Sequence, residues 1–141
     1  MAARVLDSWA LLGWLQGEEP ARAKVRGILE SAFHGETAAS MSIIDVGEVF
    51  YLMARGRRAA LAERFLSEMP MMPLQTLVPD RRLILNAARL KSRFPLSYAD
   101  AFAVETAWQQ KAAFVTGDPE MFDLTKREPI ELVWARARRP H

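Results

Sequence analysis

Four acidic side chains stand where strands are expected to end or helices to begin: Asp7, Glu48, Asp100 and Asp118. The apolar run 112–115 predicts a strand, and Asp118 follows it shortly, just before a proline, as is typical of a helix N-cap and first helical position. The shorter run 4–6 ends at Asp7 in a similar way. In a parallel α/β sheet such positions share the carboxyl edge, where these proteins bind ligands. We therefore expect the four carboxylates to converge there.

A cluster of carboxylates without histidine or cysteine offers hard oxygen ligands, which suit Mg²⁺ or Mn²⁺. Repulsion among the acids disfavours the empty site, and a cation relieves it. Glu48 supports this interpretation, because Ile44, Tyr51 and Leu52 place it in an apolar helical stripe without a basic neighbour one turn away. A buried, unpaired carboxylate is costly. The predicted chemistry is phosphodiester hydrolysis by metal-activated water, with one or two ions.

Each of these acids also has a purely structural interpretation. Asp7 and Asp118 can serve as helix caps, and Asp100 stands in a capping-box position. Asp45 lies one turn before Glu48 and three residues after the expected cap Ser42, so capping is favoured over metal binding there. Asp80 follows a strand expected at the outer edge of the sheet, and we interpret it as a cap only.

The periodicity predicts alternating strands and helices. Strands are expected at 4–6, 37–41, 74–78, 112–115 and 129–133, and helices at 9–15, 20–33, 43–54, 58–68, 80–91, 98–109 and after 118. The proline-containing segment 69–73 is expected to be a loop. The strand at 37–41 has a poor strand composition and is required mainly by the alternation. This pattern predicts an α/β fold, a three-layer α/β/α sandwich around a mainly parallel sheet of about five strands.

Composition limits the protein class. The 141 residues suit one domain, 1–141, with a core over about 4–133 and a short basic tail at 134–141. The chain has no cysteine, which excludes disulfides and thiolate sites, and it has no apolar segment long enough to span a membrane. We expect a cytoplasmic protein without a membrane partner. The net charge is only +2, but basic residues cluster near 55–58, 81–93 and 136–139, which favours a polyanion such as nucleic acid.

Other enzyme classes lack their motifs. The sequence contains no phosphate-binding glycine loop and no G-x-S-x-G elbow. Its two histidines, His34 and His141, stand at a helix end and at the terminus, where neither suits a catalytic base. A phosphoaspartyl enzyme with Asp7 as nucleophile would need a second acid at position 9, which is Trp9.

Four segments together resemble the PIN domain family, and more closely its short VapC-type toxin ribonucleases: 5–8, 42–50, 96–102 and 115–122. The resemblance implies a sheet ordered 3-2-1-4-5 and a Mg²⁺- or Mn²⁺-dependent endoribonuclease. Asp7, Glu48, Asp100 and Asp118 match the acidic quartet of the family. Thr116 matches the hydroxyl residue that positions a ligand or phosphate, and Ser8 and Glu120 match supporting positions. Asp45 departs from the pattern, because a small or neutral polar residue is more usual there, and the extra acid could alter metal affinity.

The same resemblance implies partners. Members usually form homodimers and are silenced by a cognate antitoxin that covers the active site. A catalytically silent PIN-like scaffold that binds RNA or protein is the alternative, and loss of a quartet acid would have favoured it. All four acids are present.

Overall fold

The computed structural model describes residues 1–136, and it confirms the predicted α/β class. Five strands form one parallel sheet in the order β3-β2-β1-β4-β5. This is the order that the family resemblance implied. The strands are β1 (Ala2–Leu6), β2 (Thr37–Ser42), β3 (Gln75–Leu77), β4 (Ala113–Thr116) and β5 (Leu132–Trp134). Of the basic tail expected at 134–141, Trp134 belongs to β5, and 137–141 lie outside the described residues.

The strand with the weakest sequence signal is present. β2 pairs with β1 in a register that joins Ala2 to Thr37 and Val5 to Ser40. The last four residues of β2 are buried, because helices cover both faces of this central part of the sheet. Small side chains such as Ala39 suit that close packing, so tertiary burial outweighs the low intrinsic strand preference.

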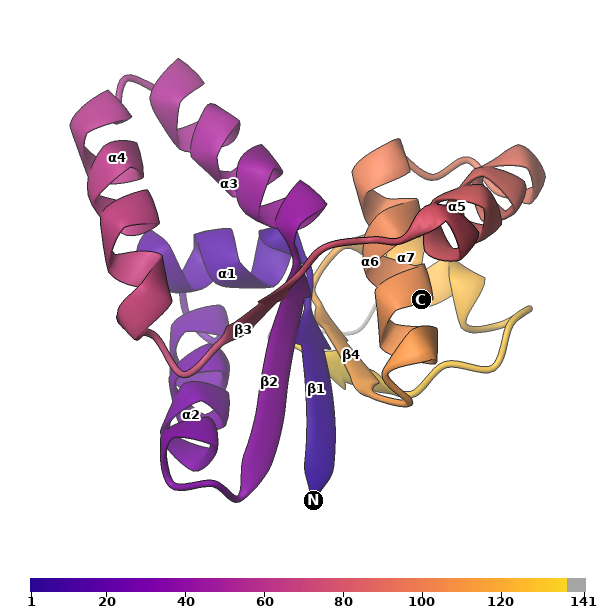
Figure 1. The fold of residues 1–141 in the computed structure, drawn as a ribbon, viewed down its shortest axis with the longest axis horizontal. Coiled ribbons are helices and arrows are strands. Elements are labelled where there is room, and N and C mark those ends of the chain that lie inside the picture. Colours follow the sequence, from indigo (N-terminus) through magenta and orange to yellow (C-terminus); the bar gives the residue numbers. More distant parts are fainter. Residues whose placement is uncertain (137–141) are drawn as a thin grey trace.

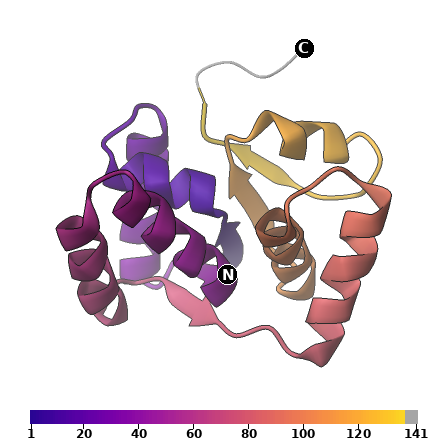
Figure 2. The same cartoon turned by 90° about the horizontal axis from the view of Figure 1, so that it is seen from above.

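Helices cover both faces of the sheet, as Figures 1 and 2 show. One layer contains α1 (Ser8–Leu15), α2 (Ala21–Phe33), α3 (Ile43–Arg55) and α4 (Ala59–Glu68), and the other contains α5 (Arg81–Arg93), α6 (Tyr98–Gln109) and α7 (Pro119–Leu124). The predicted loop at 69–73 includes a short 3₁₀ turn, Met69–Met71. The three-layer arrangement is therefore confirmed.

Consecutive residues of the two central strands face opposite layers, as the period of a strand requires. Leu6 and Val115 pack among the helices α1 to α4. Val5 and Phe114 pack among α5, α6 and α7. β1 and β4 are thus anchored from both sides, which holds the turns at their carboxyl ends in place.

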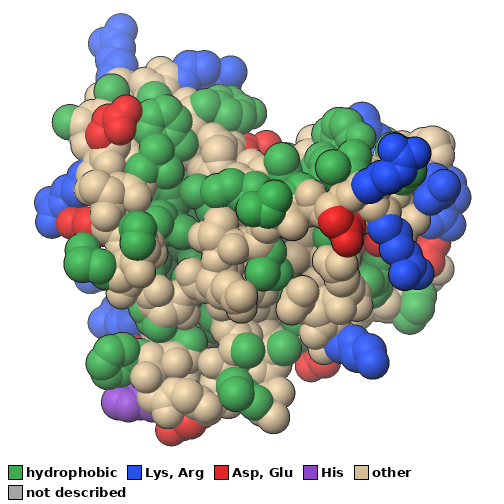
Figure 3. Space-filling model, in the orientation of Figure 1, with side chains coloured by type: hydrophobic (Ala, Val, Ile, Leu, Met, Phe, Trp, Pro, Cys, Tyr) green, Lys and Arg blue, Asp and Glu red, His purple; other side chains and the backbone are tan. Residues whose placement is uncertain are grey.

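The surface is uneven in character. Figure 3 shows hydrophobic side chains over α3 and α4 and a group of Lys and Arg side chains on the α5 side. The exposed apolar side chains on α3 and α4 are Ile43, Ile44, Tyr51, Leu61 and Leu66. Within residues 1–136, no helix is both long and apolar enough to cross a bilayer.

Candidate metal centre

The candidate site lies where the strand order reverses, between β1 and β4, which is where open α/β sheets bind ligands. Asp7 and Asp118 follow these two strands, and each caps the next helix. Asp7 Oδ1 accepts a 2.8 Å hydrogen bond from the Ala10 N–H, and Asp118 Oδ1 accepts one of 3.0 Å from the Glu120 N–H. Asp7 and Asp118 therefore cap their helices and also lie at the same edge of the sheet. Asp80, which follows the edge strand β3, caps α5 through the Leu83 N–H at 2.8 Å, as expected.

Thr116 joins the two acids. Its hydroxyl donates to Asp7 Oδ2 at 2.5 Å and accepts from the Asp118 N–H at 3.1 Å. The Thr116 side chain is fully buried, so both partners of this hydroxyl are internal to the protein. One side chain thereby holds together two carboxylates that lie far apart in the sequence.

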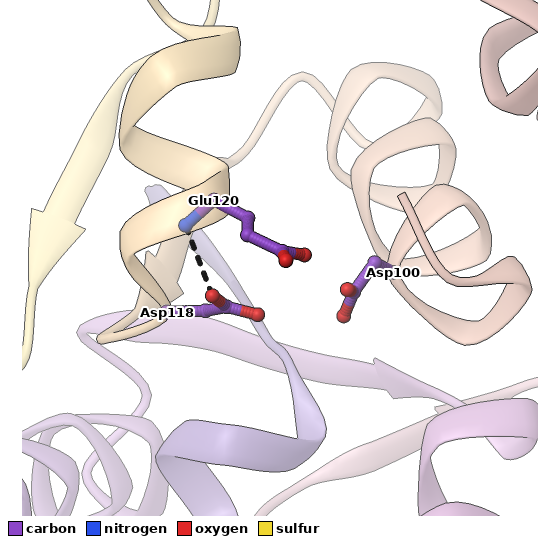
Figure 4. Close-up of side chains that lie close together, drawn as sticks. All are labelled: Asp100, Asp118 and Glu120. Carbon is purple, nitrogen blue, oxygen red and sulfur yellow. Dashed lines mark hydrogen bonds between the residues drawn. The ribbon is translucent and has the colours of Figure 1, made fainter. Parts of the chain in front are cut away.

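The outer part of the site is a group of three carboxylates, which we call the rim: Asp100, Asp118 and Glu120. Each offers an oxygen, and these oxygens lie within 4.8 Å of one another. Figure 4 shows Asp118 and Glu120 extending from the start of α7 toward Asp100 on α6. Glu120, which we expected only to support the ligands, therefore lies close to two of the four predicted ligands, Asp100 and Asp118. Asp7 and Glu48 are outside this group.

Glu48 differs from its sequence interpretation. It is half-buried rather than enclosed, because the flanking Ile44 and Tyr51 are themselves 37% and 48% exposed. It also has a partner, since the Ser8 hydroxyl donates to Glu48 Oε1. The expectation of a buried, unpaired glutamate was wrong at this position, because the apolar stripe of α3 faces solvent in part. Ser8 instead ties Glu48 to the first turn of α1.

The buried, unpaired carboxylate belongs to Asp45. This residue is 0% exposed, and neither carboxylate oxygen has a hydrogen-bond partner within residues 1–136. Capping was therefore the wrong interpretation, because the start of α3 is capped by Ser42, whose hydroxyl accepts from the Ile44 N–H at 3.2 Å. The spacing of three residues from Glu48 was the signal available in the sequence, since it places both acids on one side of the helix.

Burial dominates the electrostatics of the site. The pKa of Asp7 is raised to about 8 and that of Asp100 to about 6. Burial is the largest cause and repulsion from neighbouring acids adds to it, while hydrogen bonds from Thr116 to Asp7 and with Ser97 at Asp100 oppose the rise. Burial also raises the pKa of Asp45 well above its usual range, and repulsion from Asp7 adds to this effect. The ion pairs within residues 1–136 lie elsewhere, at Arg64–Glu68, Arg93–Glu128 and Lys126–Asp123.

Comparison with known protein families identifies the family of this chain. The model of the PIN domain matches residues 4–127. The chain belongs to the PIN domain family. No curated protein sequence matches this chain.

Solved structures share the PIN fold with this chain. VapBC2 of Rickettsia felis, bound to a DNA fragment from its promoter, has a TM-score of 0.70 at 10% identity, with 95% of this chain and 99% of that chain covered. VapC20 of Mycobacterium tuberculosis, a sarcin-ricin loop cleaving toxin, has a TM-score of 0.67 at 11% identity, covering 86% and 94%. VapBC-1 of nontypeable Haemophilus influenzae has a TM-score of 0.66 at 16% identity, covering 94% and 97%. Because the sequence identities are this low, the similarity to these structures shows a shared fold.

The donor set of this PIN domain fits a divalent cation. All the acidic groups offer carboxylate oxygen, the ligand type that Mg²⁺ and Mn²⁺ prefer. The rim oxygens are close enough to share one ion. The buried oxygens of Asp45 lack a protein partner within the described residues, and a cation would compensate their charge.

The turn that carries Asp118 depends on a close contact. Trp9, in the first turn of α1, lies against Gly117, and a Cβ added at Gly117 would come within 2.2 Å of the indole ring. The guanidinium carbon of Arg136 also lies over the Trp9 ring, 4.7 Å from its centroid. Gly117 is needed here because any side chain would displace either Trp9 or the turn between Thr116 and Asp118.

We expect Gly117→Ala to lower the free energy of unfolding by about 1–3 kcal/mol, because the added methyl overpacks the contact with Trp9. Urea denaturation measures this loss. Gly27→Ala in α2 is the matched control, since its added Cβ meets nothing within 4 Å, and it should raise stability by up to about 1 kcal/mol. Adding Trp9→Ala to Gly117→Ala should relieve the clash. A Gly117→Ala variant as stable as the parent would contradict the packing argument.

Proposed function

We propose that this PIN domain protein is a metal-dependent endoribonuclease and the toxin of a toxin–antitoxin pair. The observation that carries the proposal is the gathering of six carboxylates at the switch point of a PIN fold: Asp7, Asp45, Glu48, Asp100, Asp118 and Glu120. None of them joins an ion pair within residues 1–136. The chain is proposed to act as a single domain over 1–141, in the cytoplasm.

The residues proposed to hold the ion, Mg²⁺ or Mn²⁺, are the quartet Asp7, Glu48, Asp100 and Asp118. A bound divalent cation would supply an activated water near neutral pH and offset negative charge on the reacting phosphate. One or two ions are compatible with the quartet. Glu120 stands at the rim and is proposed to support the ligands there.

The remaining groups are proposed to position these ligands. Thr116 fixes Asp7 relative to the Asp118 turn through its two hydrogen bonds, and its complete burial favours this role over contact with a phosphate. Ser8 holds Glu48 toward α1. Such supporting contacts typically change metal affinity or activity by about 10- to 100-fold when they are removed.

The proposed partners are RNA, a cognate antitoxin and a second copy of the chain. Two of the similar structures are of VapBC proteins, and VapC20 is described as cleaving the sarcin-ricin loop, which supports a toxin with an RNA substrate. An apolar cleft between α3 and α4, lined by Ile43, Val46, Leu66, Met69 and Leu74 among others, supports a protein partner. The basic side chains on the α5 side suit the phosphates of RNA.

The proposal predicts metal-dependent cleavage of RNA by the purified protein. With Mg²⁺ or Mn²⁺ we expect fragments that carry a 5′-phosphate and a 3′-hydroxyl, formed by in-line attack of water. Excess chelator should abolish cleavage, and added metal should restore it. Sequencing of RNA ends after induced expression would identify the cleavage site. Full activity in excess chelator would overturn the mechanism, and RNA binding without cleavage with either metal would favour the binding-scaffold alternative.

A further inference from the structure

Asp45 is, with Asp7, one of the two fully buried acids of the site. The backbone N–H of Ser8 lowers its pKa, but this effect is smaller than the opposite effects of burial and of three neighbouring acids. Asp45 is 0% exposed, and both of its carboxylate oxygens are without a hydrogen-bond partner in residues 1–136. The charged groups that act on it most strongly are other acids, Asp7, Glu48 and Asp100. It therefore stands among the acids of the site, near Asp7 and Glu48.

A structural role would require a stronger partner than the Ser8 N–H, because this group does not form a hydrogen bond of normal geometry with either Asp45 oxygen. Buried carboxylates in proteins are paired, hydrogen-bonded or bound to a metal. The cap of α3 is supplied by Ser42, and the Ser8 hydroxyl is used by Glu48. The ion pairs of residues 1–136 lie elsewhere. Of pairing, hydrogen bonding and metal binding, only metal binding accounts for a buried carboxylate that is surrounded by other acids.

We propose that Asp45 is a fifth carboxylate ligand of the divalent cation, on the inner side of the pocket beside Asp7 and Glu48. This inference rests on the proposed metal site. It adds Asp45, the position at which this chain departs from the pattern of the PIN family. Asp45 and Glu48 lie three residues apart on α3, so one helix supplies two ligands. Asp7, which follows β1 and is held by Thr116, supplies a third.

The proposal predicts opposite effects of one substitution on the metal-free and metal-loaded protein. Asp45→Asn keeps the size of the side chain and removes its charge. The metal-free variant should melt at a higher temperature than the parent, because the folded parent must either keep a repelled buried charge or bind a proton that the unfolded chain releases. The variant should bind Mn²⁺ at least about 10-fold more weakly, and its melting temperature should rise less when Mn²⁺ is added. A purely structural role for Asp45 would not weaken Mn²⁺ binding while stabilising the metal-free protein.

The experiment is calorimetric titration with Mn²⁺ alone, together with thermal melting with chelator and with Mn²⁺. Asp80→Asn is the matched control, since Asp80 is also an aspartate at a helix N-terminus, and it should bind Mn²⁺ as the parent does. Asp45→Ser serves in place of Asp45→Asn if the latter does not fold. If the parent and Asp45→Asn bind Mn²⁺ equally, and Asp118→Asn binds it weakly, the role of Asp45 is overturned and the proposed function stands. If the parent does not bind Mn²⁺, both are overturned.

Discussion

Asp118→Asn is expected to lower the rate of RNA cleavage by at least about 100-fold while changing the free energy of unfolding by less than about 1 kcal/mol. The fold is spared because asparagine caps a helix about as well as aspartate and can still accept the bond from the Glu120 N–H. Activity falls because the rim loses one of the three carboxylates whose oxygens lie within 4.8 Å of one another. Initial rates with saturating Mg²⁺ or Mn²⁺, and urea denaturation, measure the two effects.

Asp80→Asn separates the loss of a ligand from a change at a helix cap. Asp80 caps α5 as Asp118 caps α7, but it follows the edge strand β3. Its variant should therefore cleave RNA at the parental rate. Asp7→Asn should behave like Asp118→Asn, since the amide oxygen can still accept from the Ala10 N–H and the amide nitrogen can donate to the Thr116 hydroxyl, which reverses the direction of that bond. If Asp118→Asn and Asp7→Asn both retained full activity, the proposed mechanism would fail.

Without metal, the protein should lose stability as the pH rises from about 5 to about 8. The folded-state pKa of Asp7 is raised to about 8 and that of Asp100 to about 6, from an ordinary value of 3.8. The folded state therefore holds protons that the unfolded state has released across this range. The free energy of unfolding should fall by an amount on the order of 5 kcal/mol between these two pH values. Urea denaturation in chelator at both pH values measures the change.

Two controls test the origin of this pH dependence. Saturating Mn²⁺ should reduce or reverse it, because ionised carboxylates are the metal-binding form. Asp7→Asn should reduce it, since that side chain no longer titrates, and the raised pKa values of Asp45 and Asp100 should account for the remainder. Stability of the metal-free parent that rises from about pH 5 to about pH 8 would show that the buried acids are not protonated in the folded state.

Much of the fold could be predicted from local patterns. The strand before Asp118, the proline after it and the caps at Ser42 and Ser97 are short-range signals, and the structure contains each of the corresponding elements. β2 followed from the alternation of strands and helices, although its composition argues against a strand. The strand order came from the family resemblance and is confirmed. These features depend on backbone preferences and connection rules that act over short stretches of chain.

The sequence by itself determined which acids reach the carboxyl edge of the sheet, because the positions of Asp7, Asp100 and Asp118 relative to strand and helix ends are local. Only the tertiary structure decided which acid on α3 is enclosed. Periodicity placed Glu48 in an apolar stripe, but packing buries Asp45 and leaves Glu48 half-exposed.

The same distinction applies to the contacts that organise the site. The bond between Thr116 and Asp7 joins residues 109 apart, and the contact between Trp9 and Gly117 joins the first helix to the turn after β4. Neither leaves a periodic signal in the sequence. The physical reason is that burial and long-range hydrogen bonds depend on how whole elements pack against each other, whereas caps and strand ends depend on a few neighbouring residues.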